Sequence, residues 1–103
     1  MQIIKCLSKH IEEELQDADT YIELAMKWQK EQPDTAEVFY ELSIEEMKHV
    51  DMLHQDVVRL IQAYRQENGE PPKGMMELYN YLHEMHIAKA MQIKVKQGMF
   101  KEA

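Results

Sequence analysis

Two acidic residues and one histidine have the types and the spacing of metal ligands. Glu46 and His49 are three residues apart, which places both side chains on one face of a helix. Glu14 lies earlier in the chain, in a stretch that is equally rich in helix-forming residues. Carboxylates and a neutral imidazole that converge from different helices suit a divalent metal ion. Their convergence depends on the elements that carry them.

The composition predicts an all-α protein with a single domain over residues 1–103. Glu, Lys, Gln, Leu, Met and Ala dominate, and the chain has only three glycines and three prolines. A chain of this length usually forms one domain. Two clusters of helix-breaking residues divide the chain, with Asp34 expected to cap the second helix. The three helices are expected at about 2–31, 34–67 and 75–97.

The first two segments carry apolar stripes whose members recur with alternating steps of three and four, the pattern that left-handed helix bundles bury. Near its middle the first stripe contains Glu14, and the second contains Glu46 and His49. The full stripes are Ile4, Leu7, Ile11, Glu14, Ala18, Tyr21, Ala25 and Trp28, then Phe39, Leu42, Glu46, His49, Leu53, Asp56 and Leu60. For the third segment the expected buried face is Leu78, Leu82, Met85, Ala88, Met91 or Gln92, Val95 and Met99.

A short turn near Pro33 makes the first two helices an antiparallel hairpin and sets residue 14 opposite about residue 50. Glu14 can therefore meet Glu46 and His49. An unpaired carboxylate in a bundle core would be strongly destabilising, or would become neutral through a raised pKa. A bound divalent metal is the simplest compensation.

Other residues compete for these places. A rotation of the first stripe would turn Glu13 or Asp17 inward in place of Glu14, and Glu45 competes with Glu46. His10 is either solvated or a group close to the site, and His54 is expected on the surface. The third segment has no Glu three residues before a His, but it could complete an internal site with the following residues: Glu77 or Glu84, with His83 or His86.

The pattern Glu14-x6-Tyr21, followed by Glu46-x-x-His49 in the context Glu45-Glu46-Met47-Lys48-His49, resembles the ferritin-like superfamily over about residues 10–65. In ferritins and rubrerythrins, a Glu and a Glu-x-x-His occur twice around two irons in a four-helix bundle. This chain carries the pattern once. The resemblance therefore implies a homodimer or a higher homo-oligomer, like the short chains of encapsulated ferritins. In a pair of chains, each copy supplies one half of the four-helix bundle and of the di-iron site.

The resemblance also implies roles. Glu46 of each chain would bridge two irons, Glu14 and His49 would be terminal ligands, and Fe(II) would be oxidised by dioxygen or peroxide in a ferroxidase or peroxidase-type reaction. Tyr21 resembles the family's tyrosine near the site, which hydrogen-bonds a ligand or supplies an electron. Zinc or manganese could occupy the same ligands. The alternative is a non-catalytic helical module that binds metal or another protein.

Charge and hydropathy limit the classes of partner that the protein can bind and predict where it is located. Nineteen acidic against twelve basic residues give a net charge of −7, which disfavours nucleic acid and anionic membranes. No apolar run approaches the roughly 20 residues of a membrane span, the start has no signal-peptide pattern, and Cys6 is the only cysteine. A cytoplasmic protein is therefore expected. Residues 1–70 hold sixteen acids and seven bases and residues 71–103 three acids and five bases, so the third segment is expected to pack on an acidic body.

Overall fold

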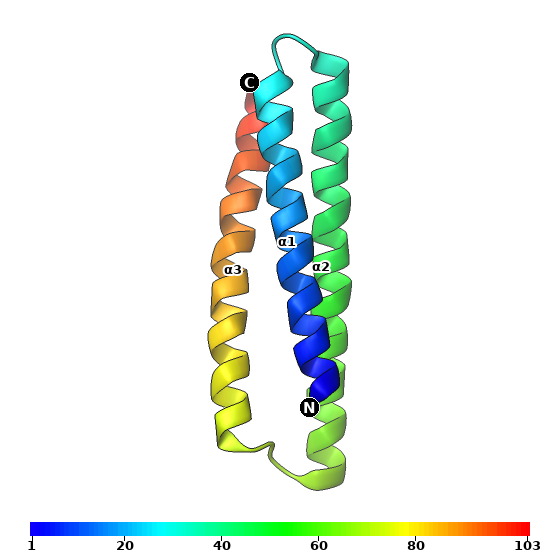
Figure 1. Cartoon of the computed structure of the whole chain (residues 1–103), viewed down its shortest axis with the longest axis vertical. Helices are drawn as coiled ribbons and strands as arrows, with labels where there is room; N and C mark the ends of the chain where they lie inside the picture. The colour runs from blue at the N-terminus through cyan, green and yellow to red at the C-terminus, as the bar shows by residue number, and fades with distance from the viewer.

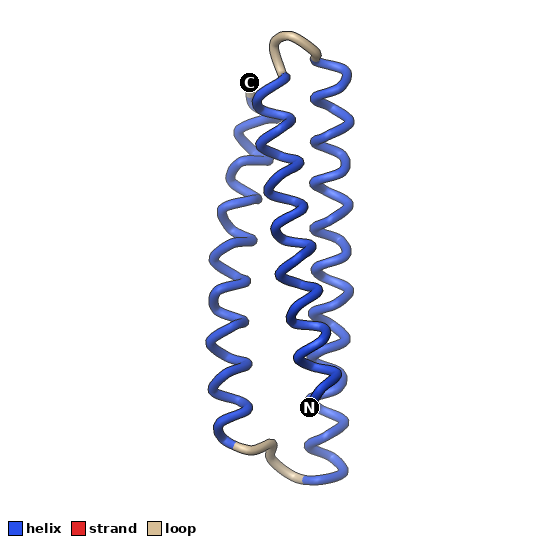
Figure 2. The backbone as a smooth tube through the Cα atoms, viewed as in Figure 1, coloured by secondary structure: helices blue, strands red, loops and turns tan.

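The protein consists of three long helices and no strand. The computed structural model describes all residues 1–103, with α1 at Gln2–Trp28, α2 at Pro33–Asn68 and α3 at Lys73–Glu102. The helices lie alongside one another in a rod of 56 × 19 × 18 Å (Figures 1 and 2). The expected all-α class and the three helices are confirmed. Only the end of the third helix differs by more than three residues, because α3 continues through Gly98 to Glu102.

The two turns are built from the proline and glycine that the sequence places there. Pro33 is the first residue of α2, where its missing N–H group loses no helical hydrogen bond. Asp34 is therefore inside the first turn and is not the N-cap; no side chain caps α2 at this end. Gly69 closes α2 with φ of 78°, a conformation that favours glycine, and its amide donates to the Arg65 carbonyl at 3.0 Å.

The hairpin of α1 and α2 contains most of the core. α1 buries half of its predicted stripe, at Ile4, Ile11, Ala18 and Ala25. At the alternate positions the following residue is buried in place of the predicted one, at Ser8, Leu15 and Ile22. On α2 the buried line is displaced by one residue from the predicted one, so that the predicted stripe borders the contact. The helices approach closely at the small residues of this line, because Ala36 and Ser43 are fully buried and the Ser43 hydroxyl lies 2.8 Å from the Ala18 carbonyl. The buried residues of α2 are Ala36, Ser43, Met47, Val50, Val57 and Ile61.

Ser43 connects all three helices through hydrogen bonds. Its hydroxyl donates to the Ala18 carbonyl of α1 at 2.8 Å and accepts from the Gln97 amide of α3 at 2.9 Å. Because Ser43 and Gln97 are both buried, these bonds satisfy polar groups that water does not reach. The chain of bonds fixes the register of the hairpin and the height of α3 beside it.

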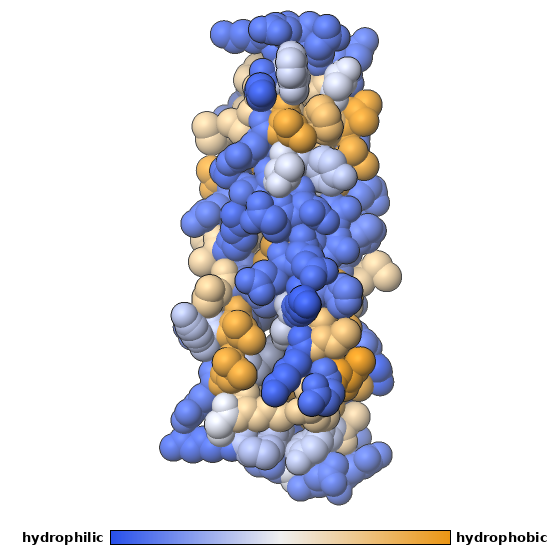
Figure 3. Space-filling model, viewed as in Figure 1, coloured by the Kyte–Doolittle hydropathy of each residue, from blue (hydrophilic) through white to orange (hydrophobic).

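α3 runs parallel to α1 and packs mainly against it (Figure 1). The face predicted for burial is wrong: Met85, Val95 and Met99 of that face are 50%, 62% and 54% exposed. α3 instead buries Ile93, Gln97 and Phe100 on its opposite side. The predicted face was wrong because α3 carries apolar residues on all sides, and because its buried side also contains polar residues. Apolar groups thus remain on the surface, as Figure 3 shows toward both ends of the rod.

Charge holds α3 against the hairpin, as the charge distribution predicted. Lys89 and Lys96 donate to the two carboxylate oxygens of buried Asp19 at 2.8 and 2.7 Å, and Lys96 also reaches Glu23 at 2.7 Å. Burial alone would raise the pKa of Asp19, but the hydrogen bonds and charges of the two lysines outweigh it and hold that pKa below its ordinary value. No helix of the protein combines the length and the apolar character that a membrane crossing requires.

Candidate metal centre

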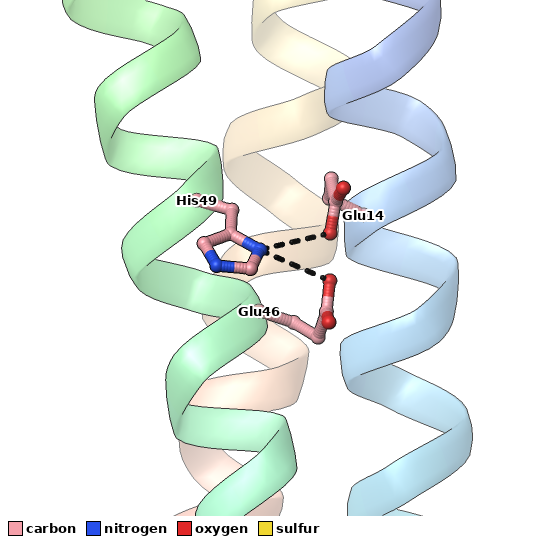
Figure 4. Close-up of side chains that lie close together, drawn as sticks. All are labelled: Glu14, Glu46 and His49. Carbon is pink, nitrogen blue, oxygen red and sulfur yellow. Dashed lines mark hydrogen bonds and ion pairs between the residues drawn. The ribbon is translucent and has the colours of Figure 1, made fainter.

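Glu14 of α1 meets Glu46 and His49 of α2 at the edge of the hairpin contact (Figure 4). One donor atom from each residue lies within 4.8 Å of the other two. His49 Nδ1 is 3.4 Å from Glu14 Oε2 and 3.6 Å from Glu46 Oε2. No other three carboxylate, imidazole or thiol side chains of the chain are gathered this closely. The hairpin thus has the register that the turn near Pro33 predicted.

The three side chains lie at the border because their neighbours point into the core. Leu15 follows Glu14 and is 2% exposed, while Met47 and Val50 follow Glu46 and His49 and are 7% and 8% exposed. Each donor is therefore about 100° around its helix from a buried residue. The donors gain a rigid base from this packing and remain open toward one flank of the hairpin.

Burial is graded across the donor set. The side chains of Glu46, Glu14 and His49 are 17%, 27% and 50% exposed. Glu46 Oε2 is shielded from solvent and accepts no hydrogen bond. At 3.6 Å the His49 nitrogen is too distant to supply one.

An unpaired buried acceptor is destabilising and calls for an explanation, such as a bound ion. The position of Glu46 Oε2 among a second carboxylate and an imidazole matches the chemistry of a divalent metal, which takes oxygen and nitrogen donors of this kind. The residues present therefore fit a metal ion.

The competing acidic residues point to solvent. Glu13 is 54% exposed and lies 3.4 Å from His10, which is itself exposed. Glu45 is 53% exposed and accepts a hydrogen bond from Lys48 at 3.1 Å. Asp17 is exposed as well. The alternatives that turned Glu13, Asp17 or Glu45 inward are therefore wrong, and His10 is a surface residue.

Tyr21 lies two helical turns from Glu14 and is half-buried. Its ring stacks on Phe39 of α2, with centroids 6.3 Å apart and an interplanar angle of 24°. Its hydroxyl makes no hydrogen bond to Glu14 or Glu46. Packing accounts for its position, and its participation in chemistry stays a prediction.

The third helix does not reach the three donors. Figure 4 shows α3 passing behind the hairpin, and no residue of α3 joins the group of Glu14, Glu46 and His49. The ring of His83 stacks on the ring of His54, with centroids 4.7 Å apart. His54 was expected on the surface, but this contact partly covers it. Glu77 lies 3.9 Å from Lys73. The internal site completed by α3 is therefore wrong, and the donor set faces the flank of the hairpin that α3 leaves uncovered.

Comparison with known protein families, with curated proteins and with solved structures finds no match to the chain. What the site can do is therefore argued from its donors, their burial and their charges.

Proposed function

We propose that the chain is one half of a ferritin-like di-iron carboxylate protein, in which two copies join around two irons and oxidise Fe(II) with dioxygen or peroxide. One observation carries the proposal. The buried Glu46 Oε2 has no hydrogen-bond partner, although Glu14, Glu46 and His49 each place one donor atom within 4.8 Å of the other two. The resemblance of Glu14-x6-Tyr21 and Glu46-x-x-His49 to the ferritin-like pattern supports the choice of iron.

A second copy supplies what one chain lacks. Three protein donors leave much of an octahedral ion's coordination shell unfilled, and α3 covers the other flank. The open flank also carries apolar groups: Leu42 is 37% exposed, and Phe39 and Leu53 are half-buried. A two-fold contact presents the same patch from both partners, so it would bring two identical donor sets together. The pair of hairpins would then form a four-helix bundle.

Charge makes this association depend on metal. Two copies bring four carboxylates, from Glu14 and Glu46 of each chain, into one shielded interface. Without cations these carboxylates repel one another strongly, because nearby water is excluded. Two Fe(II) ions carry four positive charges, which balance the four carboxylates. We therefore expect the dimer to form, or to become much tighter, when the metal is added.

The reaction treats Fe(II) as the substrate. Two Fe(II) ions release two electrons, which together with two protons reduce one dioxygen to hydrogen peroxide, or one hydrogen peroxide to two waters. Oxygen donors of Glu14 and Glu46 suit the ferric product because they are hard ligands. The imidazole of His49 adds a neutral donor that does not change the charge balance. Positioning both irons side by side allows two electrons to leave in one encounter with the oxidant.

The test is iron oxidation with matched variants. Metal-free protein receives Fe(II) without oxygen, its mass is measured by light scattering, and air is then admitted while ferric absorbance is followed. We expect one iron per chain, a dimer and rapid oxidation. Glu46→Ala and Glu14→Ala should lose all three. The neighbouring exposed residues provide controls, because Glu45→Ala and Glu13→Ala should behave like the parent protein.

Three results would change the conclusion. Oxidation by Glu46→Ala at the parental rate would overturn the ligand assignment. A monomer that holds two irons would overturn the shared site. Metal that is retained without any oxidation would favour the alternative, a non-catalytic module that holds zinc, manganese or iron in the same ligands.

A further inference from the structure

A second set of metal-binding side chains lies on the opposite side of the hairpin from Glu14, between α2 and α3. A groove of about 320 Å³ opens there, and Asp51, His54, His83 and His86 all line it. Asp51 and His54 are three residues apart on α2, and His83 and His86 are three residues apart on α3. Each pair therefore projects from one face of its helix, and His54 of the first pair meets His83 of the second across the groove.

Two of the three imidazoles are already in contact. The rings of His54 and His83 stack with centroids 4.7 Å apart and an interplanar angle of 5°, and Tyr79 stacks on His83 at 5.7 Å. Burial, and then the proximity of His54, lower the pKa of His83, while burial lowers the pKa of His86 more than Glu12 raises it.

Little else ties α2 to this part of α3. The polar contacts between the two helices, from Gln97 to Ser43 and from Lys101 to Glu37, lie near the other end of the rod. Asp51 makes no hydrogen bond or ion pair within the chain, and Lys94 is the only other charged residue in the groove lining. The donors thus sit where a cross-link between the helices is missing.

We propose that Asp51, His54, His83 and His86 form a second metal site, which takes an imidazole-preferring divalent ion such as Zn²⁺ and fastens α3 to α2. Three imidazole nitrogens and one carboxylate oxygen are a typical tetrahedral donor set for zinc. In the stacked arrangement the ring nitrogens are not gathered as closely as the Glu14, Glu46 and His49 donors. Binding therefore requires the rings to unstack by side-chain rotation, for which the groove provides space.

This site is independent of the iron site, and it can be tested with that site removed. The untagged Glu14→Ala/Glu46→Ala protein is titrated with Zn²⁺ against a chromophoric chelator, and Co²⁺ is used as a visible probe of tetrahedral coordination. We expect one Zn²⁺ per chain and an intense tetrahedral Co²⁺ spectrum. Adding His83→Ala or His86→Ala should weaken Zn²⁺ binding by about 100-fold or more, beyond the effect of losing an outer-shell partner.

The exposed His10 provides the control, because His10→Ala removes an imidazole without touching the groove. Zn²⁺ should raise the Tm of the Glu14→Ala/Glu46→Ala protein and of that protein with His10→Ala added, and should leave the Tm unchanged when His83→Ala is added instead. Equal Zn²⁺ affinity in the His10→Ala and His83→Ala variants would overturn the proposal. Failure of the Glu14→Ala/Glu46→Ala protein to retain Zn²⁺ would overturn it as well. Circular dichroism of each metal-free variant verifies that the helices are intact.

Discussion

The unpaired carboxylate of Glu46 predicts that the metal-free protein is made more stable by destroying its own site. The perturbation is Glu46→Leu. An unsatisfied buried acceptor is destabilising by about 1–3 kcal/mol, and Glu46 Oε2 is such an atom. The contact that the substitution removes is weak, because His49 is 3.6 Å away with its side chain 50% exposed. A pair of this kind contributes at most about 1 kcal/mol.

The net expected gain is about 1–2 kcal/mol in the free energy of unfolding, since the leucine also adds apolar surface at the hairpin contact. For a domain of this size each kcal/mol raises Tm by about 4–8 °C. Thermal and urea unfolding of protein stripped of metal by a chelator measure the difference. Glu45→Leu is the matched control, because the same substitution at a side chain that is 53% exposed should give no such gain.

Added metal should reverse the order. The parent then gains stability in proportion to its metal affinity, while Glu46→Leu gains nothing at this site. If Glu46→Leu were less stable than the parent without metal, Glu46 would be an ordinary stabilising polar residue. The unpaired Glu46 Oε2 would then be no evidence for a metal site.

Three further predictions concern the rest of the fold. Asp19→Asn should weaken the docking of α3 by about 2 kcal/mol, which is within the range for a hydrogen bond to a charged group. The value is not higher because Lys89 and Lys96 are 34% and 29% exposed and water can solvate them in the variant. Urea unfolding and amide exchange in α3 measure the effect. The pKa of Asp19 is lowered, so its contribution is complete above the ordinary value of 3.8 and is lost as pH falls through the lowered pKa. The pKa of Lys96 is raised, so its contribution is complete below 10.5 and is lost as pH rises through the raised pKa. The urea midpoint should therefore fall at both limits, and Asp19→Asn should flatten the acid limb. Gly69→Ala should destabilise the protein by about 1–2 kcal/mol, because φ is 78° at that residue. Gly98→Ala should stabilise the protein by about 1 kcal/mol, because Gly98 lies within helix α3 and has open space around it. Equal Tm values for the two variants would contradict this account of the turn.

The grouping of Glu14, Glu46 and His49 could be predicted because it depends only on local regularities. Helical periodicity fixes which residues share a face, and the short connection between α1 and α2 fixes which heights meet. The observed contact of His49 with Glu14 at 3.4 Å agrees with the register expected from the turn near Pro33. The orientation of the second stripe was less predictable. Adjacent lines of α2 both contain apolar residues, and only the close approach that Ser43 permits selects between them.

The packing of α3 could not be predicted from its own sequence. Its buried side includes Gln97, whose amide is satisfied by Ser43, a residue distant in sequence. The stacking of His54 on His83 likewise depends on how α3 is placed beside the hairpin. The pattern of residues along α3 does not indicate which side chains of α1 and α2 will contact it in the folded protein. The groove with its three imidazoles could not be predicted for this reason, and His83 and His86 were expected only as candidates for an internal site with Glu77 or Glu84.

The two donor sets lie on opposite sides of one packed hairpin, and their chemistry differs in a way that separates their ligands. Glu14, Glu46 and His49 offer two charged oxygens and one nitrogen, which favour iron and its ferric product. The groove offers three nitrogens and the carboxylate of Asp51, a set that favours zinc. Ile11 and Val50 line the groove from the hairpin core and separate it from the other flank. Because those residues are close-packed and do not rearrange easily, a metal that fastens α3 should leave the opposite flank free to meet its partner.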